Sequence, residues 1–221
     1  MDDFAARQRR QRRQRKAKAA RHALVGPGGL WEMKRQFQFA FLVDRGLQAS
    51  DTLLDLGCGT LRGGVPLIAY LDRGHYCGVD VRQSVLDEAQ KELVQHGLEC
   101  KDPRLLAASD LSRLDLDRSF SFAWSFSVLF HMTDDVLADA LGFIARHMQE
   151  GGVFYANVSI GERQPDHWRE FPVIWRSLEE YVHHARQQGF ESVEDLGPLD
   201  SLGHVSGKPG HDTQRMLRFV L

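Results

Sequence analysis

The chain has few cysteines and no long hydrophobic run, and both absences restrict what it can be. Its 221 residues include three cysteines, Cys58, Cys77 and Cys100, which form neither a disulfide framework nor a Cys-x-x-Cys metal pair. No apolar run approaches the ~20 residues of a membrane span. The basic N-terminus is not followed by the apolar block of a secretory signal. We therefore expect a cytoplasmic protein with no membrane partner.

Metal-ligand spacing is also missing. The ten histidines show no pattern such as His-Glu-x-x-His, so we expect no metal site. A hydrophobic content of 43% and a charged content of 26% are typical of a globular domain with enough apolar mass for a core. The length fits one domain with an added arm.

Positive charge is concentrated at one end of the chain. Residues 1–21 contain nine Lys and Arg against two Asp, although the whole chain has a net charge of −2. Crowded like charges oppose helix formation, and Gly26-Pro27-Gly28-Gly29 reads as a linker. Residues 1–29 are therefore predicted to be a flexible basic arm and linker. Residues 7–21 offer a site for RNA or another polyanion; the alternative is a solvated tail.

Short apolar segments alternate with helical periodicities over residues 30–221. Strands are expected at Leu53–Leu56, Tyr76–Val81, Leu105–Ala108, Phe120–Phe126, Val153–Ser159, Ser192–Leu196 and Met216–Leu221. Helices are expected over 30–45, 65–71, 85–96, 134–148 and 175–188. This alternation predicts an α/β fold, with a parallel sheet covered by helices on both faces.

The segment from Thr52 to Gly64 is an apolar strand that runs into a glycine-rich turn. Gly57 and Gly59 allow the backbone to turn tightly and to approach a ligand closely. Asp55 stands at the end of the strand, and Asp80 ends the next strand 25 positions later. A carboxylate at the end of the second strand of an open parallel sheet is where ribose hydroxyls are held. The pair predicts a nucleoside cofactor; the alternative for Asp80 is a cap of the following helix.

In their order and separation, these segments resemble the class I S-adenosylmethionine-dependent methyltransferases, over roughly residues 30–221. The resemblance implies a seven-stranded, mostly parallel Rossmann-like sheet with an antiparallel last strand, and S-adenosylmethionine as cofactor. Ser109-Asp110 sits where that family often places an acidic residue near the adenine, and Ser125–Met132 resembles its segment beside the transferable methyl. The predicted cofactor-binding residues are Asp55, Gly57, Cys58, Gly59, Thr60, Arg62, Asp80, Val81, Asp110, Ser125 and Phe126.

Several of these residues have a second interpretation. The common third glycine is replaced by Leu61, followed by Arg62-Gly63-Gly64. Arg62 is expected to pair with the methionine carboxylate of the cofactor or with an anionic substrate; the alternative is an arginine that reaches solvent. Asp110 is expected to lie near the adenine; the alternative is that Asp110 belongs to a simple turn. Phe126 either flanks the sulfonium through a cation–π contact or belongs to the core.

His131 is the candidate catalytic residue. It follows the fourth strand and has an ordinary pKa suited to orienting a substrate hydroxyl or accepting its proton at neutral pH. The alternative is a packed histidine bonded to a backbone carbonyl. Methyl transfer is an in-line displacement that depends largely on positioning, so a dedicated base is not required.

The predicted function is methyl transfer from S-adenosylmethionine to a small-molecule or glycan-like acceptor, at oxygen. No Asn-Pro-Pro-Tyr-like motif follows the fourth strand, which argues against methylation of adenine or glutamine amino groups. One alternative is an RNA methyltransferase that uses the basic arm. Another is a protein that binds S-adenosylmethionine without catalysis.

Overall fold

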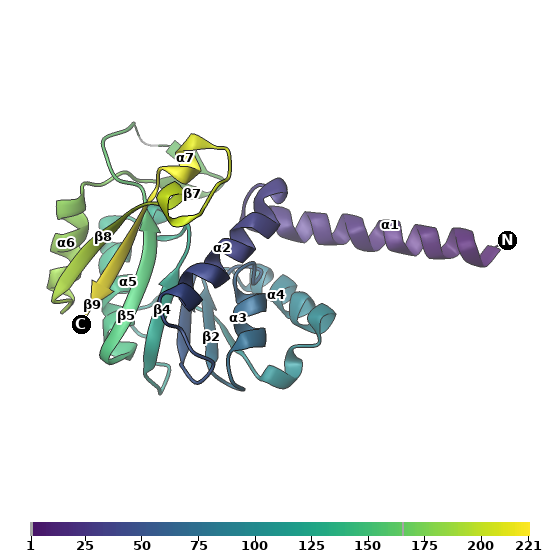
Figure 1. Cartoon of the computed structure of the whole chain (residues 1–221), viewed down its shortest axis with the longest axis horizontal. Coiled ribbons are helices and arrows are strands. Elements are labelled where there is room, and N and C mark those ends of the chain that lie inside the picture. The colour runs from purple at the N-terminus through teal and green to yellow at the C-terminus, as the bar shows by residue number, and fades with distance from the viewer. Residues whose placement is uncertain (1, 165) are drawn as a thin grey trace.

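The computed structural model describes residues 2–164 and 166–221. A seven-stranded sheet lies at the centre, in the order β3-β2-β1-β4-β5-β9-β8 (Figure 1). The strands are β1 (Leu53–Leu56), β2 (Tyr76–Asp80), β3 (Arg104–Ala107), β4 (Phe120–Ser125), β5 (Met148–Val158), β8 (Ser192–Pro198) and β9 (Arg215–Val220). Strands β1 to β5 run parallel, whereas β9 is antiparallel to both β5 and β8. The predicted sheet with its antiparallel last strand is confirmed.

Helices cover both faces of this sheet. They are α2 (Trp31–Asp44), α3 (Gly64–Tyr70), α4 (Gln83–His96), α5 (Asp134–His147), α6 (Leu178–Gln187) and the short α7 (Pro209–Asp212). Buried residues of α2, α3 and α4 form one core cluster, and those of α5 and α6 belong to a second. Within β4, Ala123 joins one cluster while its neighbours Phe122 and Trp124 join the other, as the two-residue alternation of a strand requires.

Two element boundaries differ from the expected ones by three residues or more. Strand β5 begins at Met148, five residues before the expected start, and its register against β4 shifts between Phe120 and Phe122. Helix α6 begins after Ser177, whose hydroxyl accepts from the Glu180 amide while the Glu180 carboxylate accepts from the Ser177 amide. This capping box starts the helix at Leu178, three residues later than the apolar spacing suggested.

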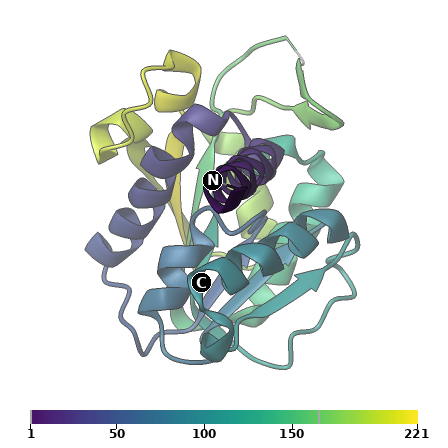
Figure 2. The same cartoon turned by 90° about the vertical axis from the view of Figure 1, so that its right-hand side faces the viewer.

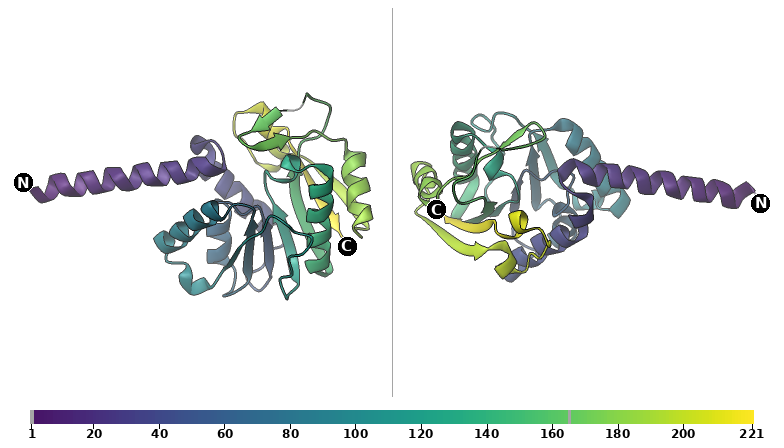
Figure 3. Two further views of the ribbon diagram at one scale, coloured as in Figure 1. Left: turned by 180° about the vertical axis from the view of Figure 1, so that it is seen from behind. Right: turned by 90° about the horizontal axis from the view of Figure 1, so that it is seen from above.

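The N-terminal segment, which was predicted to be a flexible arm, also differs from the prediction. The structure places Asp2–His22 in one helix, α1, which extends away from the sheet domain (Figures 1 and 3). Arg, Gln and Ala have high helix propensity, and in the structure this preference prevails over the repulsion between the charges. In Figure 2 α1 points toward the viewer, with its base above α4. Met1, the first residue of the predicted arm, lies outside the described residues.

The hairpin formed by β6 (Asp166–Trp168) and β7 (Phe171–Val173) was not predicted. The described part of the chain contains no helix that is both long and apolar enough to cross a membrane.

Candidate active site

A cavity of about 440 Å³ lies at the carboxyl ends of the parallel strands. Asp55 and Asp80, at the ends of β1 and β2, contribute to its wall, as do Ala108 after β3 and Phe126 after β4. Ligands bind in this crevice in open α/β sheets. The β6–β7 hairpin closes one side through Trp168, Phe171 and Pro172.

The glycine-rich turn after β1 has no room for a side chain at either of its two glycines. Gly57 has φ +78°, and a Cβ there would lie 2.3 Å from Cγ2 of Val128. Gly59 has φ +57°, and its Cβ would lie 2.8 Å from Cγ1 of Val25. The turn is held to β2, because the Gly57 amide donates to the Val79 carbonyl oxygen at 2.7 Å. Glycine at both positions is therefore required by backbone conformation and by space.

Asp80 connects the glycine turn to the start of α4. Its Oδ2 accepts from the Gly59 amide at 3.1 Å, and its Oδ1 accepts from the Arg82 amide at 3.0 Å. The Arg82 side chain adds an ion pair at 3.7 Å. A carboxylate has about four acceptor positions, so capacity remains for hydroxyl groups of a ligand. The interpretation of Asp80 as an acceptor at the site fits this geometry. The alternative as a helix cap does not, because Asp80 bonds the amide of Arg82, one residue before α4 begins, and α4 has no side-chain cap.

Asp55 is buried beneath the cavity. Its Oδ2 accepts from the Tyr76 hydroxyl at 2.5 Å. Burial raises the pKa of Asp55 to about 7, and the charge of Asp80 acts in the same direction, whereas the Tyr76 hydrogen bond and Arg62 lower it. Near neutral pH the protonated and ionised forms of Asp55 are therefore both present. A cation placed beside Asp55 favours the ionised form.

Arg62 does not reach solvent, since it is 8% exposed. Its Nη1 donates to the Val25 carbonyl oxygen at 2.9 Å, and its guanidinium carbon lies 5.9 Å from the centre of the Phe126 ring. Lys34 of α2 approaches the same ring, with Nζ 5.7 Å from the centre. Burial lowers the pKa of Lys34 to about 7, assisted by the positive charge of Arg62. Phe126 is thus both core and cavity wall, beside two buried cations.

The segment after β4 is held in a fixed conformation. Ser127 has φ +63°, and its amide donates to Oδ1 of Asn157 at 2.6 Å. The Nδ1 of His131 lies 2.7 Å from the Pro172 carbonyl oxygen. Because a carbonyl only accepts, Nδ1 carries the proton and Nε2 is the acceptor nitrogen. Burial lowers the pKa of His131, which keeps the ring neutral at pH 7. The histidine therefore both packs against a carbonyl and lines the cavity.

The structure brings most of the predicted site residues together. Those that line the cavity are Asp55, Gly57, Cys58, Gly59, Arg62, Asp80, Val81, Phe126 and His131. Burial raises the pKa of the Cys58 thiol far above its usual range, so this residue is a neutral, apolar part of the wall.

Three predicted residues do not line the cavity. Thr60 and Ser125 are fully buried, and each has a hydroxyl oxygen without a hydrogen-bond partner. Asp110 is exposed and accepts from both the amide and the hydroxyl of Ser112, which is the turn considered as its alternative. Its neighbours Ser109 and Leu111 line the cavity instead.

Sequence reasoning missed several lining residues. Val25 belongs to the segment predicted as a linker, and Gln38 belongs to α2, where its Oε1 accepts from the Trp124 indole at 3.2 Å. Phe171 comes from the unpredicted hairpin. Trp168 of the same hairpin belongs to a group of aromatic and basic residues at 167–176, for which the sequence left a pocket wall and surface packing both open. Among the described residues, no group of three His, Cys, Asp or Glu is arranged to hold a metal ion.

Residues 54–154, which include most of β1, the glycine turn and both acidic strand ends, match the model of a family described as a methyltransferase domain. Residues 54–154 are a methyltransferase domain, within a sheet of the class I fold. The methyltransferase resemblance predicted from the glycine-rich turn and the acidic strand ends is confirmed. The match ends within β5, so the hairpin and the last two strands of the sheet lie beyond it.

A curated relative, malonyl-[acyl-carrier protein] O-methyltransferase from Brevibacillus brevis, is 39% identical over 51 residues. That alignment spans 22% of this chain and 18% of the relative. It is a similarity of a short segment and leaves most of the methyltransferase domain unaligned.

Solved structures share the fold over most of both chains. An S-adenosylmethionine-dependent methyltransferase from Clostridium acetobutylicum is 16% identical, with a TM-score of 0.64, covering 85% of this chain and 92% of its own. The glycopeptide N-methyltransferase MtfA, complexed with S-adenosyl-L-homocysteine, is 14% identical, with a TM-score of 0.65 and coverages of 86% and 89%. The [4+2]-cyclase SpnF is 19% identical, with a TM-score of 0.64 and coverages of 84% and 80%. At these identities the likeness shows the fold of the methyltransferase domain alone.

Proposed function

We propose that this protein transfers a methyl group from S-adenosylmethionine to a small-molecule or glycan-like acceptor, at oxygen. The observation that carries the proposal is the placement of Asp55 and Asp80 at the ends of adjacent parallel strands, on either side of the glycine turn. The relatives with methyltransferase names support the reaction class.

The residues of the cavity fit that cofactor. Asp55 supplies a carboxylate for the ammonium group of the methionine part, and Asp80 has free acceptor positions for ribose hydroxyls. The absence of side chains at Gly57 and Gly59 keeps backbone close to the ligand. Arg62 has a buried Nε without a hydrogen-bond partner, which suits a carboxylate.

The cofactor supplies an electrophilic methyl group on a positively charged sulfur. The chain's own contribution is to position the acceptor and to exclude water. Nε2 of His131 is the acceptor nitrogen and is suited to take the proton from an acceptor hydroxyl. Trp168 and Phe171 of the hairpin flank that ring, with centroid separations of 5.8 and 6.1 Å, and shield it from solvent.

The proposal is tested first by titrating S-adenosylhomocysteine into the purified protein in a calorimeter. Replacing Asp80 with alanine should weaken binding by about 1–3 kcal/mol, as expected when a hydrogen bond to a charged group is lost. The matched control is Asp87→Ala, because Asp87 is an exposed carboxylate on α4. Equal affinities for the Asp80→Ala and unchanged proteins would remove Asp80 from the site.

Methyl transfer itself requires labelled cofactor and fractionated cell extract, followed by identification of the fraction that takes up label. Two alternatives are separated by this experiment. A protein that binds S-adenosylmethionine without transferring the methyl group, as suggested by the presence of a cyclase on this fold, would release no S-adenosylhomocysteine with any fraction. An RNA methyltransferase, favoured by the cations of α1, would label RNA and would lose activity when residues 2–18 are removed.

A further inference from the structure

Helix α1 carries a dense positive charge that the proposed reaction does not use. Its cations between residues 7 and 18 are Arg7, Arg9, Arg10, Arg12, Arg13, Arg15, Lys16 and Lys18, and all of them are exposed. No Asp or Glu occurs between residues 4 and 31. The helix extends away from the sheet domain in every view (Figures 1 and 3). The charges of the seven cations from Arg9 to Lys18 are therefore exposed to a partner outside the chain.

The distribution of these cations selects the kind of partner. With 3.6 residues per turn, the eight positions leave no gap wider than about 60° around the helix. At a rise of 1.5 Å per residue, they provide one positive charge per roughly 2 Å of axis, and duplex DNA carries one negative charge per roughly 1.7 Å. Residues 7–18 contain Ala17 as their single apolar side chain, so the helix has no apolar face for a lipid surface. Residues 5–21 contain no aromatic residue for stacking on single strands.

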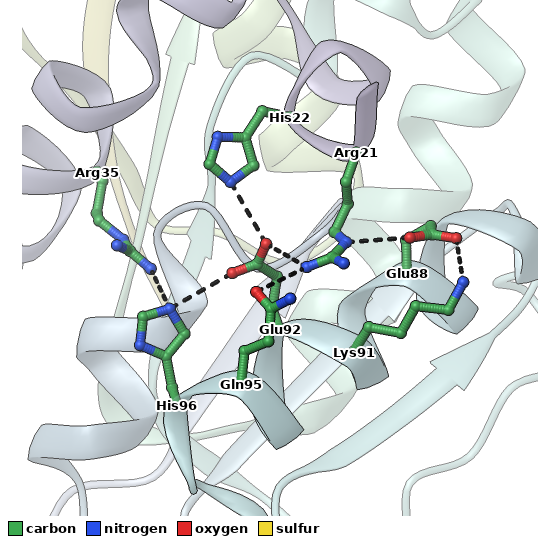
Figure 4. Close-up of polar contacts among 8 residues, drawn as sticks. All are labelled: Arg21, His22, Arg35, Glu88, Lys91, Glu92, Gln95 and His96. Carbon is green, nitrogen blue, oxygen red and sulfur yellow. Dashed lines mark hydrogen bonds and ion pairs between the residues drawn. The ribbon is translucent and has the colours of Figure 1, made fainter. Parts of the chain in front are cut away.

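The base of α1 is fixed to α4 by a buried network (Figure 4). Nη1 of Arg21 donates to Oε1 of Glu92 at 2.7 Å, and Nε of Arg21 donates to Glu88 at 3.0 Å. Glu92 is fully buried. Burial lowers the pKa values of His22 and His96, which both approach Glu92, so Arg21 supplies the opposing charge at pH 7. A paired buried carboxylate is costly to separate from its partner, which holds the helix base in place.

The segment that follows the anchor reaches the cavity within three residues. The Ala23 carbonyl oxygen accepts from Nη2 of Arg169 in the β6–β7 hairpin at 2.7 Å. Val25 lines the cavity, and its carbonyl oxygen accepts from Arg62. A crevice between α1 and α4 is lined by Arg15 and Lys18. A polyanion held along α1 would therefore lie beside the cavity rim.

We propose that α1 is a docking arm for the phosphate backbones of a nucleic-acid duplex. The charges of the helix are opposite in sign to those of the phosphates and similar in spacing, and its width of about 10–12 Å fits the major groove of B-DNA, which is about 12 Å wide. The binding requires no methyl transfer, so its test is independent of the proposed function.

The experiment measures anisotropy of a labelled 20-base-pair DNA duplex, and of the RNA duplex of the same sequence, with the full chain between 50 and 200 mM NaCl. The logarithm of affinity should fall linearly with the logarithm of salt concentration, with a slope of about −0.9 per phosphate contacted. Replacing Arg12 and Arg13 together with glutamine should make the slope shallower by about 1.8. Over a fourfold rise in salt, the unchanged protein should then lose about tenfold more affinity than the variant.

The matched control replaces Arg73 and Arg113 with glutamine, since both are exposed arginines of the sheet domain and the change in net charge is identical. The proposal is supported if the full chain binds either duplex and the control keeps the salt slope of the unchanged protein, while the Arg12 and Arg13 variant has a shallower slope. An equal change of slope in control and α1 variants overturns it. So does tighter binding to a single strand or to vesicles of anionic lipid than to the duplexes, or no duplex binding at 50 mM NaCl.

Discussion

Asp55 makes ligand binding by this protein dependent on pH. With its pKa raised to about 7, roughly a tenth of the free protein carries an ionised Asp55 at pH 6, and roughly nine tenths at pH 8. If the ammonium group of the cofactor binds only the carboxylate form, the affinity should rise about tenfold between these pH values, which is about 1.4 kcal/mol.

Calorimetric titration with S-adenosylhomocysteine at pH 6, 7 and 8 tests this expectation. Measurements in two buffers with different ionisation enthalpies count the protons released, and about half a proton per ligand is expected at pH 7. Asp55→Asn keeps an oxygen that accepts from Tyr76 but cannot ionise, so this variant should bind weakly with no pH dependence from this position.

Lys34 must be separated from this effect, because its pKa is also lowered to about 7. If its ammonium contacts the ligand carboxylate, loss of its proton weakens binding as the pH rises, opposite in sign to Asp55. Lys34→Met removes that titration. An affinity that does not increase with pH in the Lys34→Met protein would refute the assignment of the cofactor ammonium to Asp55.

The same pKa shift has a consequence for stability. The folded Asp55 carboxyl keeps its proton up to about pH 7, whereas the unfolded chain loses it near pH 3.8. Folding therefore takes up a proton in this window, and the contribution of Asp55 to the free energy of unfolding falls as pH rises from 4 to 7. Urea unfolding at pH 8 should show Asp55→Asn to be more stable than the unchanged protein.

Three further predictions concern the cavity wall and the residues that support it. Gly46→Ala, at φ +96° in open space, should cost about 1 kcal/mol in urea unfolding, and Gly57→Ala should cost clearly more because of its additional clash; equal costs would contradict the steric account. Asn157→Ala removes the acceptor of the Ser127 amide and should lower stability by about 1–3 kcal/mol, with an unchanged urea midpoint as the contrary result. A chain that begins at residue 30 should bind S-adenosylhomocysteine more weakly than one that begins at residue 19, because it lacks Val25; equal calorimetric affinities would show that Val25 contributes no binding.

Much of the fold was readable from the sequence because its signals are local. Strand β1 was predicted at Leu53–Leu56, as observed. A short apolar run between turn residues is typical of a buried strand. Gly97 ends α4 in the left-handed conformation, as its position after the periodic segment suggested. The glycine turn and the two acidic strand ends followed from the same strand–turn–helix pattern.

Other parts of the site depend on contacts between distant residues. The β6–β7 hairpin has strands of three residues, too short for a periodicity to be recognised. Its place over the cavity is fixed by the Pro172 carbonyl against His131 and by Arg82 beneath the Phe171 ring at 5.2 Å. Asp110 was selected by its position in the sequence, but its local bonds to Ser112 compete successfully for the carboxylate.

The boundary of the domain shows why sequence pattern alone was insufficient. Gly26-Pro27-Gly28-Gly29 has the composition of a linker. For that reason, the residues before it were predicted to form a flexible arm. Arg21 nevertheless pairs with Glu92, 71 positions away, and nothing in the composition around either residue marks the other as its partner. Once the pair forms, the backbone from Ala23 to Val25 passes over the glycine turn, where the Val25 carbonyl oxygen accepts a hydrogen bond from Arg62. The segment read as a linker is therefore a wall of the cavity, and the domain begins at the anchor rather than at residue 30. A partner that moves α1 would consequently act on the same wall that covers Gly59.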